Sequence, residues 1–258
     1  MLDDLKFWIT EREAIRVKKE AGLPRPWTKD PILATYRFCN VHREDDKVTK
    51  FIKEHFRDPN DGHPAMILNM AMCRLINWIP TLEAIGFIDN WKQERPIFTA
   101  TMRHLTEKPG KVWTGAYMIT AEADGSPKYE SVARTLDWIA EDAWGTDTCL
   151  QTWEDLKGAP RVGSFIAAQI VADLKHTHML RDAADHDTFC APGPGSVRGL
   201  NLLRGLPQGT KWGQPEFQAE VNRLRLEVSD VIDVDAQDMQ NCLCEFSKWK
   251  RGCARSKY

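Results

Sequence analysis

A turn rich in glycine and proline leads directly into an apolar run, and this junction constrains the fold more than any other feature. Gly158, Pro160 and Gly163 form the turn, and residues 165–174 are mostly Ala, Ile and Val. The first turn of a helix leaves backbone N–H groups without intrahelical partners, and such groups suit a phosphate. Glycine and proline also punctuate ordinary turns between helices. The junction therefore predicts either a phosphate-binding helix start or a plain helix-to-helix turn.

A second glycine-rich segment follows, with an acidic residue before it and a basic residue after it. Asp187 precedes Gly193 and Gly195, and Arg198 comes next. Successive glycines allow backbone N–H groups to converge on an anion. We expect residues 182–206 to form a long ordered loop, and such loops usually carry function. The combination indicates an enzyme that acts on a nucleic-acid backbone or a diphosphate.

Helical periodicity dominates the rest of the chain, since apolar residues recur at three- and four-residue spacing and Gly or Pro marks the ends. The pattern predicts an all-α protein, with one helix that opens at Pro96 and others over residues 3–21, 42–56, 64–77, 81–85, 128–144, 165–174, 214–228 and 235–251. Residues 111–120 are either extended or a helix interrupted at Gly115. We expect a single helical domain with a helix-hairpin-helix near its middle.

The net charge is close to zero, with 35 Lys and Arg against 37 Asp and Glu. A field that attracts polyanions over the whole surface is therefore absent, and any nucleic-acid surface must be a local patch. The basic chain end is one candidate, although a solvated tail would have the same composition; it contains Lys248, Lys250, Arg251, Arg255 and Lys257.

Other features of the composition narrow the class of protein. No apolar run is long enough to span a membrane, and the acidic start does not resemble a signal peptide. The seven cysteines are odd in number and lack the spacing of a zinc or iron–sulfur site, so reduced thiols are expected. The sequence therefore predicts a cytosolic protein without a metal site.

Residues 36–48 (YRFCNVHREDDKV) gather charged and amide side chains ahead of an apolar stripe. If this segment is helical, Arg37, Asn40 and Arg43 share a face. Two guanidiniums and an amide on one face could grip phosphate oxygens. The alternative, which the charge pattern alone favours, is a solvated helix start with local ion pairs such as Arg43 with Asp46.

Two later helices carry polar side chains at helical spacing. Gln169 and Asp173 lie four residues apart in an otherwise apolar run, as a satisfied core pair or as part of a site wall. Asn241, Glu245 and Lys248 share one face of the last helix, where an ordinary surface face is the alternative.

Four segments together resemble a known family: residues 27–49, 158–174, 191–201 and 238–252. These segments are similar to the bacteriophage α-glutamyl/putrescinyl thymine pyrophosphorylases and occur in the same order along the chain. Members of that family are amino acid:DNA transferases of thymine hypermodification. The resemblance covers most of the chain from Trp27 to Tyr258. It implies an N-terminal helix and linker over residues 1–26, and a transferase domain over residues 27–258 related to helix-hairpin-helix DNA glycosylases.

The resemblance also implies a reaction and its partners. The substrate would be double-stranded phage DNA in which 5-hydroxymethyluracil carries a diphosphate. A free amino acid such as glycine or serine, or a polyamine, would displace pyrophosphate from the 5-methylene carbon. We expect a monomer in the cytoplasm of the infected bacterium, with no required cofactor, although a divalent ion could accompany the diphosphate.

Roles for individual residues follow from this resemblance. Asp187 would be the general base or would orient the amine. The diphosphate would be held by Arg37, Arg43 and Arg198 and by the backbone of Gly193 and Gly195. Further substrate contacts would come from Asn40, Gln169, Asp173, Asn241, Glu245 and Lys248. DNA phosphates would meet Arg161, Gly163, Ser164, Lys250 and Arg251.

Comparison with the glycosylases leaves two rival functions open. Their hairpin carries two glycines around an apolar residue, whereas here Arg161 stands at the first glycine position. Phe165 occupies the position of the lyase lysine, which excludes Schiff-base chemistry there, while Asp187-Thr188 resembles the catalytic Asp-Thr pair. The rivals are a monofunctional glycosylase, in which Asp187 activates water, and a non-catalytic DNA-binding module.

Overall fold

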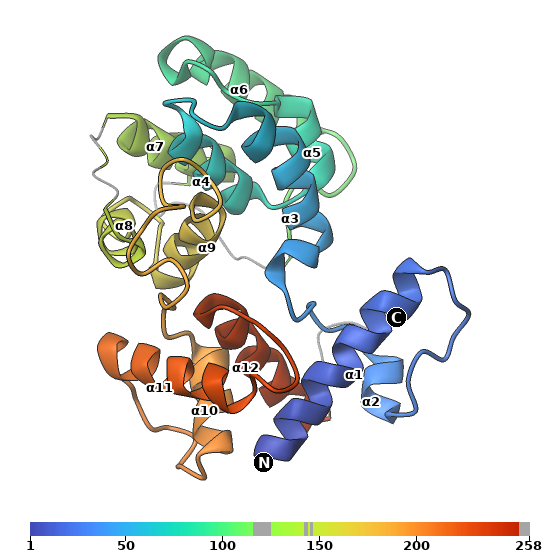
Figure 1. The fold of residues 1–258 in the computed structure, drawn as a ribbon. Coiled ribbons are helices and arrows are strands. Elements are labelled where there is room, and N and C mark those ends of the chain that lie inside the picture. Colours follow the sequence, from blue (N-terminus) through green and yellow to red (C-terminus); the bar gives the residue numbers. More distant parts are fainter. Residues whose placement is uncertain (116–124, 142–143, 145–146, 253–258) are drawn as a thin grey trace. The chain divides into compact units, whose positions relative to one another are not determined.

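The computed structural model describes residues 1–115, 125–141, 144 and 147–252, and over these residues the chain is helical and contains no strand (Figure 1). The predicted all-α class is confirmed. The chain divides into two compact units. The first unit combines residues 1–46 with the stretch that starts at Asp187, and the second unit comprises residues 47–186. This division does not bear on the domain boundary predicted after residue 26, which stays a prediction.

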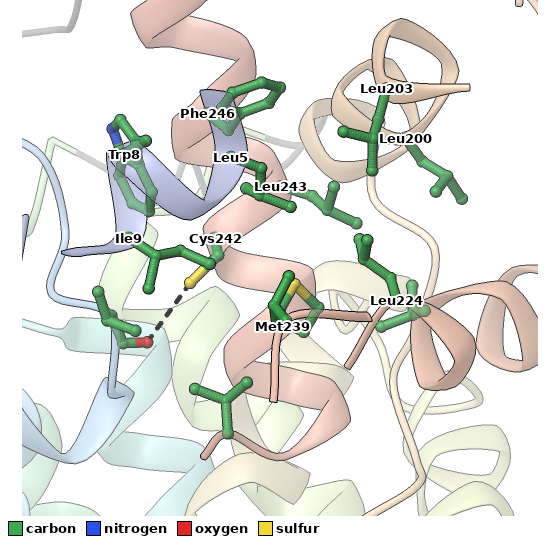
Figure 2. Packing of buried hydrophobic residues seen from close by; sticks show 14 of the residues in the cluster. Leu5, Trp8, Ile9, Leu200, Leu203, Leu224, Met239, Cys242, Leu243 and Phe246 are labelled. Atoms are coloured by element: carbon green, nitrogen blue, oxygen red, sulfur yellow. Dashed lines mark hydrogen bonds between the residues drawn. The ribbon is translucent and has the colours of Figure 1, made fainter. Parts of the chain in front are cut away.

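Helix α12 (Ala236–Lys250) is central to the first unit and packs against α1 (Leu2–Glu20), α10 (Pro194–Leu203) and α11 (Gln214–Glu227). A short helix, α2 (Pro31–Thr35), belongs to the same unit. Apolar side chains from these helices fill one core, as Figure 2 shows for Leu5, Trp8, Ile9, Leu200, Leu203, Leu224, Met239, Cys242, Leu243 and Phe246. The helices predicted over 3–21, 214–228 and 235–251 are confirmed.

Helix α10 occupies residues 194–203 of the loop expected over residues 182–206. Its glycines lie where it crosses α12, and they leave no room for side chains. A Cβ atom at Gly199 would lie 2.1 Å from the carbonyl oxygen of Leu243, and one at Gly195 would lie 2.3 Å from Sγ of Cys244. The loop prediction is wrong for residues 194–203 and holds for the non-helical residues 182–193. The glycines of α10 permit close helix packing, and in the sequence such glycines resemble a turn signal.

Helix α4 (Met66–Ile76) is the buried centre of the second unit, and every residue in it is buried. This confirms the buried helix predicted over 64–77. Around it, the unit contains α3 (Lys47–Ile52), α5 (Ile79–Ile85), α6 (Trp91–Glu107), α7 (Lys128–Glu141), α8 (Cys149–Leu156) and α9 (Ser164–Leu174).

Two helix starts in the second unit differ from the prediction. Helix α6 begins at Trp91, because the Asn90 side chain caps it by accepting the backbone N–H of Gln93, so Pro96 lies inside the helix. The helix predicted over 42–56 begins only at Lys47 and continues as a π-helical turn over residues 53–57. Residues 111–115 are not helical, and residues 116–120 lie outside the described part of the chain.

Helices α8 and α9 are joined by a turn over residues 157–163, where the sequence predicts the hairpin. Arg161 in this turn has a φ of 65°, a left-handed conformation that favours glycine. Arg161 therefore adopts the backbone conformation that the resemblance to the glycosylases would assign to a glycine at this position. Gly163 is the N-cap of α9, which begins at Ser164.

Candidate functional site

Residues 36–46 do not form the helix that would align Arg37, Asn40 and Arg43 on one face. The backbone of Tyr36 is extended and ends α2, and only residues 43–45 form a 3-10 turn. Asn40 folds the segment back on itself, since its backbone N–H donates to Asp46 at 3.1 Å and its side-chain amide donates to the Asp45 carbonyl at 2.8 Å. The predicted shared face is therefore wrong. The Asn40 side chain binds a backbone carbonyl that a helix would use for its own hydrogen bonds.

Arg12 of α1 holds this segment from the other side. Its guanidinium donates to the carbonyl oxygens of Phe38, at 3.2 Å, and Cys39, at 3.0 Å, and also to the Asn40 side-chain oxygen. Arg12 is only 7% exposed. A single side chain thus fixes three consecutive residues of the segment.

The polar face of α12 meets the same segment. Asn241 donates to the Asn40 carbonyl at 3.3 Å, and the carboxylate of Glu245 accepts the backbone N–H of Cys39 at 3.3 Å. Lys248 forms an ion pair with Glu245. The predicted face of Asn241, Glu245 and Lys248 is thus present and partly buried. We call the group formed by Arg12, Asn40, Asp46, Asn241, Glu245 and Lys248 the Asn40 cluster.

Burial and neighbouring charges raise the pKa of two members of the Asn40 cluster. Burial raises the pKa of Asp46, and this outweighs the hydrogen bond from Asn40 and the nearby guanidiniums of Arg43 and Arg12. Burial acts to lower the pKa of Lys248, but the adjacent Glu245 carboxylate prevails and raises the pKa overall. The pKa of Asp46 is therefore above that of an ordinary aspartate, and the pKa of Lys248 is above that of an ordinary lysine.

Next to the cluster, Asp238 in the first turn of α12 binds His42 and Arg43, which follow Asn40 in the chain. Its carboxylate accepts the backbone N–H of Arg43 at 2.9 Å and lies 3.2 Å from Nδ1 of His42. The hydrogen bond with Asp238 raises the pKa of His42, against the opposing effect of burial.

A pH titration tests this His42–Asp238 contact. In nuclear magnetic resonance, His42 should titrate above the ordinary value of about 6.5, and in Asp238→Asn the midpoint should fall. Because the pKa of His42 is raised in the folded state, the contact stabilises fully below about pH 6.5 and is lost as the pH rises through the folded pKa. An unchanged midpoint in Asp238→Asn would contradict the assignment.

Arg198 and the glycine segment lie on α10. The backbone N–H of Gly193 donates to Ser196 Oγ at 3.1 Å, and Gln240 of α12 donates to the same oxygen at 3.1 Å. The Gly193 N–H is thus used in capping α10. Arg198 lies one residue before the tight contact at Gly199, and its Nε is buried without a hydrogen-bond partner among the described residues.

Asp187 is exposed, and its backbone is held by two neighbouring elements. Its carbonyl oxygen accepts from the Arg225 guanidinium at 2.7 Å and from the N–H of Ala236, at the start of α12, at 2.9 Å. The residue therefore has a fixed position on the surface of the first unit.

Asp173 lies in the core of the second unit. Its carboxylate is fully buried and forms a bidentate ion pair with Arg74 of α4, which is 2% exposed. Arg74 also donates to Thr49 at 3.1 Å and to Asn77 at 3.2 Å. Of the two alternatives, the structure supports the satisfied core pair, with Arg74 rather than Gln169 as the partner. Gln169 is partly exposed on α9.

The expected DNA contacts occupy two places. Arg161 and Gly163 are exposed in the turn before α9, and the Ser164 carbonyl accepts from the Trp153 indole at 2.9 Å. In the first unit, Arg251 is exposed, whereas Lys250 donates to Asp4 of α1 at 3.0 Å. Asp4 therefore offsets part of the positive charge of the basic chain end.

Arg12 is the member of the Asn40 cluster that the motif analysis missed. A signal for it exists in the sequence. The apolar stripe of α1 runs through Leu5, Trp8, Ile9 and Ile15, and Arg12 occupies a core position in the same stripe. A charged residue at a core position needs partners, so it indicates a buried polar group.

Two other kinds of site have no candidate in the described part of the chain. Among the described residues, no group of three or more His, Cys, Asp or Glu side chains could hold a metal ion. In the same part of the chain, no helix has the length and apolar character needed to cross a bilayer.

Comparison with known proteins gives two matches. The whole chain, residues 1–258, matches the model of a family described as "5-hmdU DNA kinase, helical domain". A 5-hmdU DNA kinase of Bacillus phage SP10 is 25% identical over an alignment of 280 positions. The alignment covers 93% of this chain and 43% of that relative. The chain thus spans less than half the length of the relative. No solved structure matches.

Proposed function

The chain belongs to the family of 5-hmdU DNA kinase helical domains, and from this premise we propose that it acts on phage DNA containing 5-hydroxymethyldeoxyuridine. The phage relative, named for the kinase step, supports a place in the hypermodification of thymine positions. The site of action would be the cytoplasm of the infected bacterium.

The reaction we propose is replacement of a diphosphate on the 5-methylene carbon by an amine. The nitrogen lone pair of an amino acid attacks the methylene carbon, and the C–O bond to the diphosphate breaks with its electron pair. Pyrophosphate departs, and a carboxylate takes the proton from the attacking nitrogen. The protein has to supply positioning, neutralisation of the leaving charge and a base. The target base would be flipped out of the duplex, since the methylene carbon is poorly reached within the stack.

The observation that carries this proposal is the Asn40 cluster. It joins two of the four segments that resemble the transferases, residues 27–49 and 238–252, around the buried guanidinium of Arg12. Carboxylates and cations lie side by side there, and this combination suits an amine nucleophile and an anionic leaving group. A third segment, residues 191–201, packs on α12 through Gly195 and Gly199.

Individual roles remain part of the proposal. Asp187 would accept the proton or orient the amine, and Arg37, Arg43 and Arg198 would neutralise the diphosphate. The DNA backbone would meet the turn before α9 and the exposed basic end of α12.

A product assay separates this function from its rivals. The chain is incubated with DNA carrying 5-(pyrophosphoryloxymethyl)uracil and a mixture of amino acids, and the nucleosides are analysed by mass spectrometry. Released pyrophosphate and a heavier nucleoside support the transferase. A free base with an abasic site indicates a glycosylase, and DNA binding without turnover indicates a binding module. Phosphate transfer from ATP to hydroxymethyluracil DNA would assign the kinase step to this chain instead.

Asp187→Asn tests the proposed base within the same assay. Turnover should fall about 100-fold, the usual weight of a general base, while DNA binding stays within a few-fold. Asp233→Asn is the matched control, because Asp233 is also an exposed acid of the first unit. Full turnover in Asp187→Asn would remove Asp187 from the mechanism.

A further inference from the structure

One donor atom of Arg12 is not accounted for by the fold. Nε and Nη2 donate to the segment over residues 38–40, whereas Nη1 is buried without a hydrogen-bond partner among the described residues. A buried donor that lacks a partner costs about 1–3 kcal/mol. Native proteins retain few such groups, and each calls for an explanation such as a ligand.

The surroundings of Arg12 place an anion close to this cation. Asn40 bridges Arg12 and Asp46, since its side-chain oxygen accepts from Arg12 and its backbone N–H donates to Asp46. Arg12 and Asp46 also interact electrostatically. Arg12 and Asp46 thus both contact Asn40, and their charges are opposite to those of the carboxylate and the ammonium of an α-amino acid.

We propose that Arg12 binds the carboxylate of the incoming nucleophile, and that it thereby selects α-amino acids over diamines. This inference rests on the proposed transfer function. Nε and Nη2 are occupied by the fold, and Nη1 supplies the remaining donors, which can form charge-assisted hydrogen bonds to a carboxylate. A diamine would bring a second cation to Arg12 and would leave Nη1 without a partner.

Asp46 completes the placement of the nucleophile. The ammonium group of the bound amino acid lies against its carboxylate and gives up a proton to it. The neutral nitrogen then attacks the methylene carbon of the DNA, and pyrophosphate leaves with the electrons of the C–O bond. The cationic nitrogen formed by the attack gives its second proton to Asp187, the base of the proposed function. The raised pKa of Asp46 suits this step, because a more basic carboxylate accepts a proton more readily.

The test compares nucleophiles on one enzyme preparation. Rates with activated DNA are measured against glycine, glycinamide and putrescine, and the ratio of kcat/KM for glycine to that for glycinamide is taken. In Arg12→Gln this ratio should fall at least about 10-fold through a higher KM for glycine, a loss of about 1.4 kcal/mol or more in carboxylate binding. Because both rates come from the same sample, the ratio does not depend on the fraction of folded enzyme.

Arg16→Gln provides the matched control. Arg16 lies one turn further along α1 and pairs with Glu13, Glu20 and Asp45, none of which belongs to the Asn40 cluster, so its substitution should leave the ratio unchanged. An unchanged ratio in Arg12→Gln would overturn the inference and would leave an internal water as the partner of Nη1.

If Arg12→Gln does not fold, the wild-type protein still decides the matter. Glycine should then react at least about 10-fold more efficiently than glycinamide or putrescine, a difference of about 1.4 kcal/mol, and equal efficiency would overturn the inference while the transfer function stands. If no amine reacts with activated DNA, the proposed function itself has failed, and the role of Arg12 fails with it.

Discussion

Gly199→Ala should destabilise the first unit by about 3 kcal/mol or more, at the upper end of the usual effect of overpacking a core. The added methyl would lie 2.1 Å from the Leu243 carbonyl oxygen and 2.7 Å from its carbonyl carbon. These are backbone atoms of α12, so they cannot move aside without moving the helix. Chemical denaturation followed by circular dichroism measures the loss, and binding of activated DNA should weaken in parallel.

The neighbouring glycines provide graded controls. A Cβ at Gly193 would meet only side-chain atoms, of Gln240 at 3.4 Å and of Ser196 at 3.5 Å. Gly193→Ala should therefore change stability by less than about 1 kcal/mol. The methyl added in Gly195→Ala would meet Sγ of Cys244. A second substitution, Cys244→Ala, should therefore recover part of the lost stability. Normal stability of Gly199→Ala would show that α10 and α12 do not cross as closely as described.

Asp173→Ala should cost about 3–5 kcal/mol, because it leaves the Arg74 guanidinium charged and buried without its carboxylate. The double variant Arg74→Met/Asp173→Leu should lose less than the single variant, since apolar side chains of similar volume can replace a buried pair. Thermal and chemical denaturation give both values. Asp182→Ala, at an exposed acid of the second unit, is the control.

Activity measurements on the double variant separate structure from substrate binding. If Asp173 is a core residue, the folded double variant should keep the wild-type KM for the amine at a permissive temperature. A stable Asp173→Ala protein with a raised KM would instead make Asp173 a substrate contact.

The parts of the fold that depend on local pattern were predictable from the sequence. The apolar stripes of α1, α4 and α12 are the surfaces that these helices bury, and the i, i+4 spacing placed Asn241 and Glu245 on one face. Helix α10 was missed because its glycines serve a contact with α12, a helix much later in the chain, and a local pattern cannot contain that information.

The candidate site was only half predictable for the same reason. The spacing of residues 36–48 suggested a helical face, but the shape of this segment is set by Arg12, which lies 26 to 28 residues earlier in the chain. Pro96 indicated a helix start, whereas the Asn90 cap had already begun that helix at Trp91. In each case a tertiary contact or an earlier cap prevailed over the nearest local signal.

The discontinuous first unit has a consequence for the order of folding during synthesis. Its core needs α1 from one stretch of the chain and α10, α11 and α12 from another, and the whole of residues 47–186 is made between them. While those residues emerge from the ribosome, Leu5, Trp8 and Ile9 have no helical partners from the later stretch. The second unit is contiguous and can close first. Arg12 therefore acquires the α12 side of its cluster only after the last helix has been translated.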